Sequence, residues 1–266
     1  MFKKLFAVTA LSAIATVSYA ASAQAANFTY SSGGYRNANV TNQGSFSESV
    51  NQQGYETFDF NGSTTLPGND RVKYSYDGSG RTQVVTLNNK SEMKWAPAAV
   101  VAEDNKSQYL QVFEGKKVVI ETAKQGDTFN YFGLHLGSLS DGNVLEFFNA
   151  GKAVEFDYLD TKGVQKVATT LTFDLLKTLA PTLGYGNQTN GFFEFFSQGF
   201  NDNFDKIVIS QSNNKGGFET DNHTFRIAKG KYSQAASVPE PSIALGILAV
   251  GGSMFVGKRK QQKSAK

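Results

Sequence analysis

The chain contains no cysteine among its 266 residues, and it has only two histidines and one tryptophan. The lack of cysteine excludes disulfide bonds, zinc–thiolate sites and a cysteine nucleophile. The sequence also contains no Gly-x-Ser-x-Gly elbow, no His-Glu-x-x-His pair, no phosphate-binding loop and no dinucleotide fingerprint. These absences remove the commonest enzyme classes, and we predict that the chain has no catalytic residues and is not an enzyme.

Carboxylates are the one catalytic chemistry that these absences leave open. A glycosidase needs only two acids at a defined separation, and the expected strands carry acids such as Glu146, Glu155 and Asp157. Acids that alternate with apolar residues are more often the solvated side of a strand, so a polysaccharide hydrolase or lyase is the second alternative. His135 in "YFGLHLG" alternates with apolar neighbours, which predicts a half-buried structural histidine.

Basic residues are concentrated at the two ends of the chain. The formal net charge is +3, but residues 1–26 contribute +2 and residues 238–266 contribute +4, which leaves −3 for the middle. A body that binds nucleic acid usually has a basic surface. We therefore expect no nucleic-acid partner.

The first 25 residues have the three parts of a secretory signal peptide. "MFKK" is a basic start, "LFAVTALSAIATVSYA" is an apolar stretch, and "ASAQAAN" supplies small residues at the spacing that signal peptidase requires. We predict cleavage between Ala25 and Ala26, with cleavage after Ala23 as the alternative. The chain is therefore expected to be exported, with the Sec translocon and signal peptidase as transient partners.

Residues 26–232 are predicted to form one all-β domain, a single antiparallel β-sandwich or jelly roll. Runs such as "AVEFDYLD" and "KVATTLTFDLL" alternate with period two, as in strands with one face on a core and one in water. Turn sequences such as "FEGKK" and "SNNKGG" separate them, and helices are expected only near "LLKTLAP" and "VVAEDNKSQ". Residues 26–54 are polar and turn-rich, so they are either a loose arm or the first edge strands, and residues 233–237 form a linker.

The last expected strand carries a candidate metal ligand. The segment "NFDKIVISQSNNKGGFETDNHTFRIA" predicts a strand, a glycine-rich turn and a final strand, and it resembles the closing strand of carbohydrate-binding jelly rolls. In that family the acid that matches Asp221 helps to hold a structural calcium, so the resemblance implies a calcium site. Calcium takes about six to eight oxygen ligands, and Glu56 and Asp59 in "GYETFDFNG" are the candidate counterparts. The alternative is that Asp221 caps a turn or bonds neighbouring strand ends.

Aromatic residues are abundant, with 22 phenylalanines and 11 tyrosines. Sugars stack on flat rings and form hydrogen bonds to amides and carboxylates. The segment "YGNQTNGFFEFFSQGF" combines these residue types, although paired phenylalanines more often build a core. We select Tyr185 and Trp95 as candidate ligand-binding residues, and a lectin-like carbohydrate-binding module as the first alternative function.

The C-terminal segment combines a Pro-Glu-Pro, an apolar run and a basic cluster. The apolar run from Ile243 to Gly257 has 15 residues, four of them glycine. A helix of that length spans about 22 Å, whereas the hydrocarbon core of a membrane is about 30 Å thick. We therefore predict a marginal transmembrane helix at about 242–257. The cluster Lys258, Arg259 and Lys260 stops it, and residues 263–266 form a basic tail on the cytoplasmic side.

This order of Pro239-Glu240-Pro241, apolar helix and basic end closely resembles the PEP-CTERM sorting domain of Gram-negative bacteria and cyanobacteria. The resemblance covers about residues 238–262. It implies recognition by an exosortase, a membrane cysteine transpeptidase, and cleavage near Pro239, Glu240 and Pro241. Two prolines keep such a segment extended and accessible to a protease.

The sequence therefore predicts an exported, exosortase-processed protein. It is tethered to the inner membrane before processing and then lies in the cell envelope, at the outer surface or in the extracellular matrix. We expect a non-catalytic structural or adhesive role in association with extracellular polysaccharide. No cofactor is expected apart from the structural calcium.

Overall fold

The structure, a computed structural model, describes most of the predicted β-domain. The described residues are 25–31, 33–37, 43–62, 65–78, 82–85, 97, 105–137, 139–160, 162–179, 184–185, 188–189, 191–199, 201–213 and 216–233. The predicted signal peptide up to Gln24 and the sorting segment after the linker lie outside these residues.

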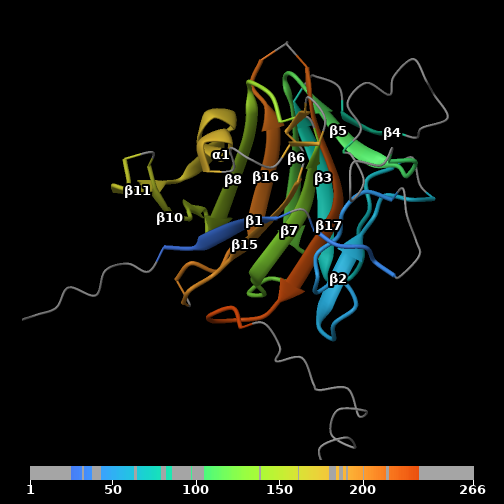
Figure 1. The fold of residues 1–266 in the computed structure, drawn as a ribbon. Helices are drawn as coiled ribbons and strands as arrows, with labels where there is room; N and C mark the ends of the chain where they lie inside the picture. The colour runs from blue at the N-terminus through green and yellow to red at the C-terminus, as the bar shows by residue number, and fades with distance from the viewer. Residues whose placement is uncertain are drawn as a thin grey trace, which may run out of the picture.

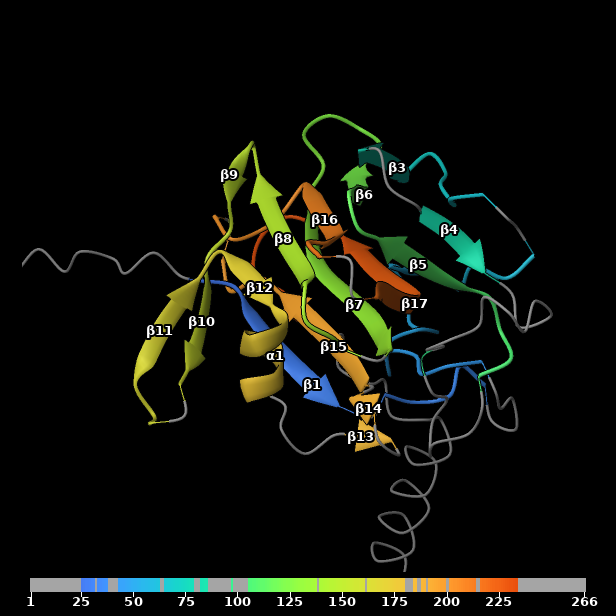
Figure 2. The ribbon, with the colours of Figure 1, turned by 90° about the horizontal axis from the view of Figure 1, so that it is seen from above.

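Two antiparallel sheets pack face to face, which confirms the expected all-β, sandwich-like fold (Figures 1 and 2). In the larger sheet, β5 pairs with the first half of β17, and β2 pairs with the second half. This sheet has seven strands, which are β1 (Asn27–Ser31), β15 (Gly191–Phe196), β7 (Phe129–Gly137), β17 (Gly217–Ile227), β5 (Tyr109–Phe113) and β4 (Thr82–Val85) in spatial order, with β2 (Tyr55–Phe58) beside β17.

The smaller sheet covers the inner face of the larger one. Its six strands are β12 (Thr170–Thr172), β8 (Asn143–Asn149), β16 (Lys206–Gln211), β6 (Lys116–Thr122) and β3 (Val72–Gly78) in spatial order, with β9 (Lys152–Ala153) beside β8. Two hairpins stand apart from both sheets, β10 (Phe156–Leu159) with β11 (Gln165–Ala168) and β13 (Gly184–Tyr185) with β14 (Gln188–Thr189). The helix α1 (Phe173–Leu179) follows β12 directly.

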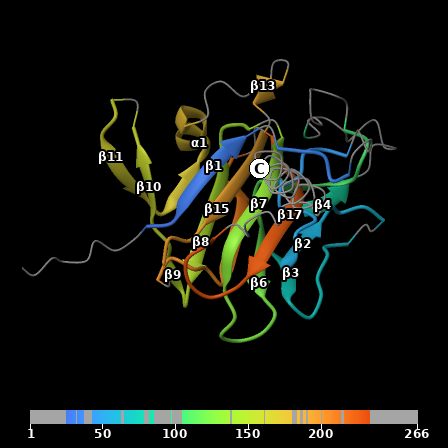
Figure 3. The same cartoon turned by 60° about the horizontal axis from the view of Figure 1, so that its bottom comes forward.

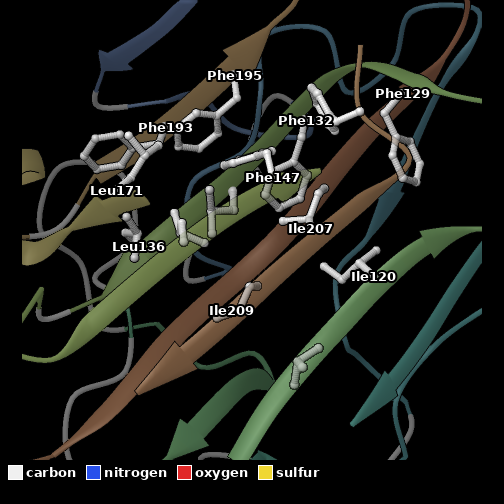
Figure 4. Close-up of a cluster of buried hydrophobic side chains, with 14 of the residues drawn as sticks. Ile120, Phe129, Phe132, Leu136, Phe147, Leu171, Phe193, Phe195, Ile207 and Ile209 are labelled. Carbon is white, nitrogen blue, oxygen red and sulfur yellow. The ribbon is translucent and has the colours of Figure 1, made fainter. Parts of the chain in front are cut away.

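The core between the sheets is rich in phenylalanine (Figure 4). Phe132 of β7 and Phe193 and Phe195 of β15 point into it, because alternate residues of a strand face the same side. The ring centroids of Phe147 and Phe195 are 4.8 Å apart, and those of Phe132 and Phe225 are 5.0 Å apart. One phenylalanine of each pair in "GFFEFF" thus builds the core.

The segment "KVATTLTFDLL" differs from the single strand that its alternation predicted. Val167 lies in β11 and is 54% exposed, whereas Leu171 lies in β12 and is fully buried. The chain then enters α1 at Phe173, where the Leu175 N–H donates to Thr172 Oγ1 (3.4 Å). This threonine cap, with Asp174 in the first turn, favours a helix over the continued strand.

Residues 26–54 contain both an edge strand and a covering segment. Asn27–Ser31 forms β1 at the edge of the larger sheet. Just before it, Ala26 is buried in the core, and its N–H donates to the Glu155 carbonyl (2.8 Å). Residues 43–54, which we call the strap, lie over the outer face of the same sheet, where Ser45 and Ser47 bond to His135 and Tyr131 of β7.

Candidate functional site

The outer face of the larger sheet, which points away from the core, carries many buried polar side chains. Strand register places them in rows across the sheet. We call Ser31, Phe192, His135 and Asp221 the polar row, and we call Asn27, Phe196, Tyr131, Arg226 and Tyr55 the aromatic row. The aromatic row lies toward the end of the sandwich where β17 finishes (Figure 3).

The strap covers the polar row. Phe46 of the strap is 1% exposed and exchanges two backbone hydrogen bonds with Gly34 (2.8 and 2.9 Å). Ser45, Ser47 and Ser49 beside it are also buried. The expectation that each strand has one face in water is therefore wrong for β7, whose nine residues are all buried. The strap supplies a second covering layer that the alternation of β7 does not indicate.

Hydrogen bonds from the polar row hold the strap in place. The Ser45 N–H donates to His135 Nδ1 (3.0 Å), and Asn222 Nδ2 donates to the carbonyls of Gln43 and Ser45 (2.8 and 2.9 Å). Gly44 lies between these bonds with φ +75°, and a Cβ at Gly44 would come within 2.8 Å of His135 Nδ1. Only glycine fits there without displacing the polar row.

A β-bulge turns Asp221 and Asn222 toward the strap. The register of β17 with β7 shifts between Asp221 and Thr224, and Asn222 has φ +51°, which asparagine tolerates better than most residues. Asp221 is fully buried and accepts hydrogen bonds from Asn105 Nδ2 (3.0 Å), Ser107 Oγ (3.1 Å) and the Asn222 N–H (2.8 Å). Burial raises the pKa of Asp221 well above its usual value, and these hydrogen bonds oppose the shift only in part.

His135 is fully buried, rather than half buried as predicted. Its Nδ1 accepts the Ser45 N–H, so the ring proton is placed on Nε2, which finds no hydrogen-bond partner among the described residues. Burial lowers the pKa of His135 to about 3, so the ring is neutral at pH 7. A metal at Nε2 would require the proton on Nδ1, which would break the bond to the strap. The geometry therefore assigns His135 to positioning the strap.

Glu219 lies on the same face as Asp221, two residues earlier in β17. It is 1% exposed, and its Oε1 accepts a hydrogen bond from Gln111 Nε2 (2.7 Å). Burial raises the pKa of Glu219 to about 8, so the Glu219 carboxyl is mostly protonated at pH 7. A protonated carboxyl is what a general acid requires. Both acids, however, are covered by protein and bonded to neighbouring side chains, as is typical of structural residues.

The aromatic row is only partly covered. Tyr131 is buried, and its hydroxyl donates to Glu194 Oε1 (2.5 Å). Half-buried Tyr232, which follows β17, stacks on Tyr131 with 5.0 Å between ring centroids, and the Tyr55 hydroxyl donates to the Tyr232 hydroxyl (2.7 Å). The guanidinium of Arg226 lies 5.9 Å from the ring centroids of both Tyr55 and Tyr232. Half-exposed rings beside a guanidinium can stack on a sugar or attract an anionic ligand.

The three predicted calcium ligands each have their own partner in the protein. Glu56 in β2 lies 3.7 Å from the Arg71 guanidinium, and Asp59 forms an ion pair with Arg36 (2.7 Å). Asp221 is bonded within the polar row. In the part of the chain that the structure describes, no group of three or more His, Asp or Glu side chains is arranged to hold a metal.

The other predicted site residues lie at or beyond the limits of the described chain. Tyr185 is in the β13–β14 hairpin, of which only the backbone is described, and Trp95 lies outside the described residues. Ala25 and Ala26, at the predicted signal-peptide cleavage site, are the first described residues, and both are buried. Pro239, Glu240 and Pro241 and the basic cluster Lys258, Arg259 and Lys260 also lie outside the described residues.

Sequence reasoning missed the strap and the side chains that hold it. Two signals were present in the sequence. A glycine precedes the serine-rich "SFSES", and the polar tetrapeptide "TDNH" interrupts an otherwise alternating final strand. The glycine is Gly44, where the strap backbone comes close to His135, and the polar tetrapeptide contains the β-bulge at Asn222.

Comparison with known proteins adds no family to this geometry. No protein-family model matches the chain, and no curated protein is similar enough to count as a relative. Within the described ranges, no helix is both long and apolar enough to cross a membrane.

Proposed function

We propose that this chain is an exported surface or extracellular-matrix protein that an exosortase sorts through its Pro-Glu-Pro signal. Its role is structural or adhesive, in association with extracellular polysaccharide, and its body is not catalytic. The observation that carries this proposal is the order of Pro239-Glu240-Pro241, a marginal apolar helix at about 242–257 and the basic residues Lys258 to Lys260. A short, weakly inserting helix suits a protein that is anchored briefly and then cut.

Several features of the body support a structural role. On the larger sheet, the inner face packs against the core and much of the outer face lies beneath the strap. Buried Asp221, Glu219 and His135 bond to neighbouring groups inside the protein. A cysteine-free sandwich needs no oxidative folding after export, and a jelly roll is the finer description that we propose for it.

Expression of the full chain with and without an exosortase tests this proposal. In a bacterium that has the enzyme, we expect the extracted protein to have lost the mass of its C-terminal segment, and in the deletion strain we expect it to keep that mass. The Pro239→Ala/Pro241→Ala variant should remain uncut in the inner membrane. Pro67→Ala, a proline loss in the body, is the matched control and should be processed normally. Equal processing in both strains would contradict the proposal.

A carbohydrate-binding module is the second candidate function, and the half-exposed aromatic row is the observation that favours it. Glycan-array or polysaccharide pull-down experiments test it directly. Binding that is lost in Tyr185→Ala or Trp95→Ala would identify the predicted residues as the contact, whereas loss only in Arg226→Gln would identify the aromatic row. Turnover of a polysaccharide by the protein would instead support the hydrolase or lyase alternative.

Structural calcium, which the resemblance to carbohydrate-binding jelly rolls implies, stays a separate proposal. Asp221, Glu56 and Asp59 are its candidate ligands. If calcium holds strand ends together, its chelation should lower the melting temperature and its re-addition should restore it. An unchanged melting temperature would remove calcium from the proposal and leave the sorting function untouched.

A further inference from the structure

The last described residues fix the place where the chain leaves the body. The Tyr232 N–H donates to the Ser197 carbonyl (2.9 Å), its ring stacks on Tyr131, and its hydroxyl accepts a hydrogen bond from Tyr55. These contacts hold the chain up to Ser233 against the end of the sandwich where β17 finishes (Figures 1 and 3). We call this the exit end.

The chain beyond Ser233 is too short to let the body turn freely above a membrane. Eight residues lie between Ser233 and Ser242, where the predicted membrane segment begins. Even fully extended they span only about 30 Å. A compact domain of roughly 200 residues has a radius of gyration of about 17 Å and therefore a diameter of about 40 Å. The tether therefore keeps the exit end within about 30 Å of the membrane and prevents the opposite end of the body from facing it.

The exit end carries exposed lysines. Lys229 and Lys231 are exposed in the turn after β17. The Ala228 N–H donates to the Thr128 carbonyl (3.1 Å), which places the turn between β6 and β7, with exposed Lys124, beside them. The middle of the chain has a net charge of −3, yet no acid occurs between Asp221 and Glu240.

The carboxylates at this end are largely occupied within the protein. Asp202 is 3% exposed and accepts hydrogen bonds from two backbone N–H groups, and Asp205 accepts one from the Ala150 N–H (2.9 Å). Glu121 is the register partner of Lys206, so these two charges offset each other. Asp127 is half-buried in the β6–β7 turn.

Two exposed carboxylates also lie near this end: Asp70 precedes Arg71, whose carbonyl accepts the Ala123 N–H (2.8 Å), and Glu48 precedes Ser49, which bonds the Tyr232 side chain. Exposed Lys124, Lys229 and Lys231 outnumber these two exposed carboxylates, so the exit end has a small excess of positive charge.

We propose that the exit end of the body docks on an anionic lipid surface through Lys124, Lys229 and Lys231 while the chain is tethered. This inference rests on the proposed function, since it requires a membrane segment at about 242–257. Each lysine near an anionic surface strengthens binding several-fold, so loss of two lysines should weaken partitioning by about 30-fold at low salt. Docking of this kind holds the intervening Pro-Glu-Pro close to the membrane surface, where a membrane enzyme cuts.

Vesicle flotation of the full chain tests the docking. The probes are vesicles of phosphatidylcholine alone and vesicles in which about one third of the lipid is phosphatidylglycerol. The variant is Lys229→Gln/Lys231→Gln, and the matched control is Lys162→Gln/Lys166→Gln, which removes two exposed lysines from the β10–β11 hairpin region. We expect the variant to lose about 30-fold in partitioning to anionic vesicles and nothing on neutral ones, while the control partitions like the unmodified chain.

Three outcomes would overturn the docking, and they are distinguishable. If the variant partitions to anionic vesicles as well as the control does, the lysines do not bind the lipid surface. This outcome leaves the proposed membrane segment unaffected. If the full chain does not float with neutral vesicles, the membrane segment itself fails, and the sorting proposal fails with it. If the variant loses binding to polygalacturonate but keeps its vesicle affinity, the exit end contacts acidic polysaccharide instead.

A second measurement reports orientation, and the absence of native cysteine makes it simple. Fluorophores are attached at Lys229→Cys or Lys162→Cys in the full chain, and the vesicles carry a quencher on their lipid headgroups. We expect strong quenching at position 229 and little at position 162. Equal quenching at the two positions would mean that the body tumbles above the membrane, which contradicts the docking.

Discussion

Both faces of β7 in the larger sheet are buried, yet they are built from different residues. On β7, Phe132, Leu134 and Leu136 point inward, while Tyr131 and His135 point outward. The inner face excludes water by packing on the smaller sheet, and the outer face is closed by a strap held through hydrogen bonds. One strand therefore carries an apolar interior on one side and a polar interior on the other.

The two faces also contribute differently to the free energy of unfolding. Apolar burial stabilises the fold by about 25 cal/mol per Å², whereas a buried hydrogen bond contributes about 0.5–1.5 kcal/mol net. A buried polar group that loses its partner, however, costs about 1–3 kcal/mol. We expect the inner face to supply most of the free energy of unfolding and the outer face to fix the position of the strap.

Phe132→Ala is the strongest test of the inner face. The Phe132 ring lies 5.0 Å from Phe225 and 6.1 Å from Phe147, centroid to centroid, so its removal opens a cavity between the sheets. We expect the free energy of unfolding, measured by urea denaturation, to fall by about 3–5 kcal/mol. Phe132→Leu, which keeps most of the volume, should lose much less. A loss below about 1 kcal/mol in Phe132→Ala would mean that the inner face is not the main source of stability.

Gly44→Ala tests how tightly the outer face fits the strap. Gly44 and Gly54 both have positive φ, +75° and +88°, but only a Cβ at Gly44 meets other atoms, whereas nothing lies within 4 Å of one at Gly54. Gly54→Ala should therefore lower the free energy of unfolding by about 1–2 kcal/mol, which is the cost of placing a residue with a Cβ in the left-handed backbone conformation. Gly44→Ala should cost about 2 kcal/mol more by urea denaturation, because it pushes the strap away from His135 and Asn222. Equal costs for the two variants would show that the strap is loosely held.

The pH dependence of stability tests the buried ionisable groups. For His135 and His223, burial lowers the folded-state pKa to about 3, so their contribution is present above pH 6.5 and is lost as the pH falls toward 3. For Glu219 the pKa is raised to about 8, so its contribution is present below pH 4.5 and is lost as the pH rises toward 8. The pKa of Asp221 is raised as well, so it acts in the same direction as Glu219. Between pH 4.5 and 6.5 the two histidines and Glu219 change the stability in opposite directions, so we expect the pH dependence there to be weaker than that of the histidines alone.

Above pH 6.5 the histidines are neutral in both the folded and the unfolded state, so only Glu219 and Asp221 make the stability depend on pH. We expect Glu219 to remove about 2 kcal/mol of stability between pH 6.5 and 8, because one proton bound only in the folded state changes stability by about 1.4 kcal/mol per pH unit. Urea denaturation at both pH values measures the loss, and Glu219→Gln should shrink it by that amount. Glu146→Gln, a change on the half-buried outer side of β8, should leave the loss unchanged. A stability that is flat up to pH 8 would show that Glu219 is ionised in the folded protein.

The core side of the sheets follows from the sequence because it depends on local alternation. The segment "NFDKIVISQSNNKGGFETDNHTFRIA" predicts a strand, a turn and a final strand, and β16 and β17 lie there. Helix α1 also lies where "LLKTLAP" indicated, although it begins two residues earlier, at Phe173. These elements are set by neighbours in the sequence, so a single sequence suffices to predict them.

The outer face does not follow from the sequence because its partners are distant. Ser45 and His135 are 90 residues apart, and Asn222 bonds to Gln43 across 179 residues. The alternation of polar and apolar residues within a segment gives no information on such distant contacts. The strap is also polar, which is the composition expected of an exposed arm. Asp221 was found as a notable acid in the last strand, but its role depends on Asn105 and Ser107, which no spacing rule connects to it.

Tyr232→Phe is the finest test of the comparison, because it removes only the hydrogen bonds of one hydroxyl, to Tyr55 and to Ser49, and keeps the packing. The Phe ring should still stack on Tyr131, while the bond from the Tyr55 hydroxyl is lost. We expect the free energy of unfolding to fall by about 0.5–1.5 kcal/mol by urea denaturation, and Tyr55→Phe should cost about the same. The double variant should cost little more than Tyr232→Phe alone, because Tyr232→Phe already removes the bond from the Tyr55 hydroxyl. Tyr76→Phe, at an exposed tyrosine, is the control and should be neutral. Strictly additive losses would mean that the two hydroxyls stabilise the protein independently. The hydrogen bonds that stabilise the outer face would then be those of the strap, and the Tyr55–Tyr232 bond at the exit end would not be one of them.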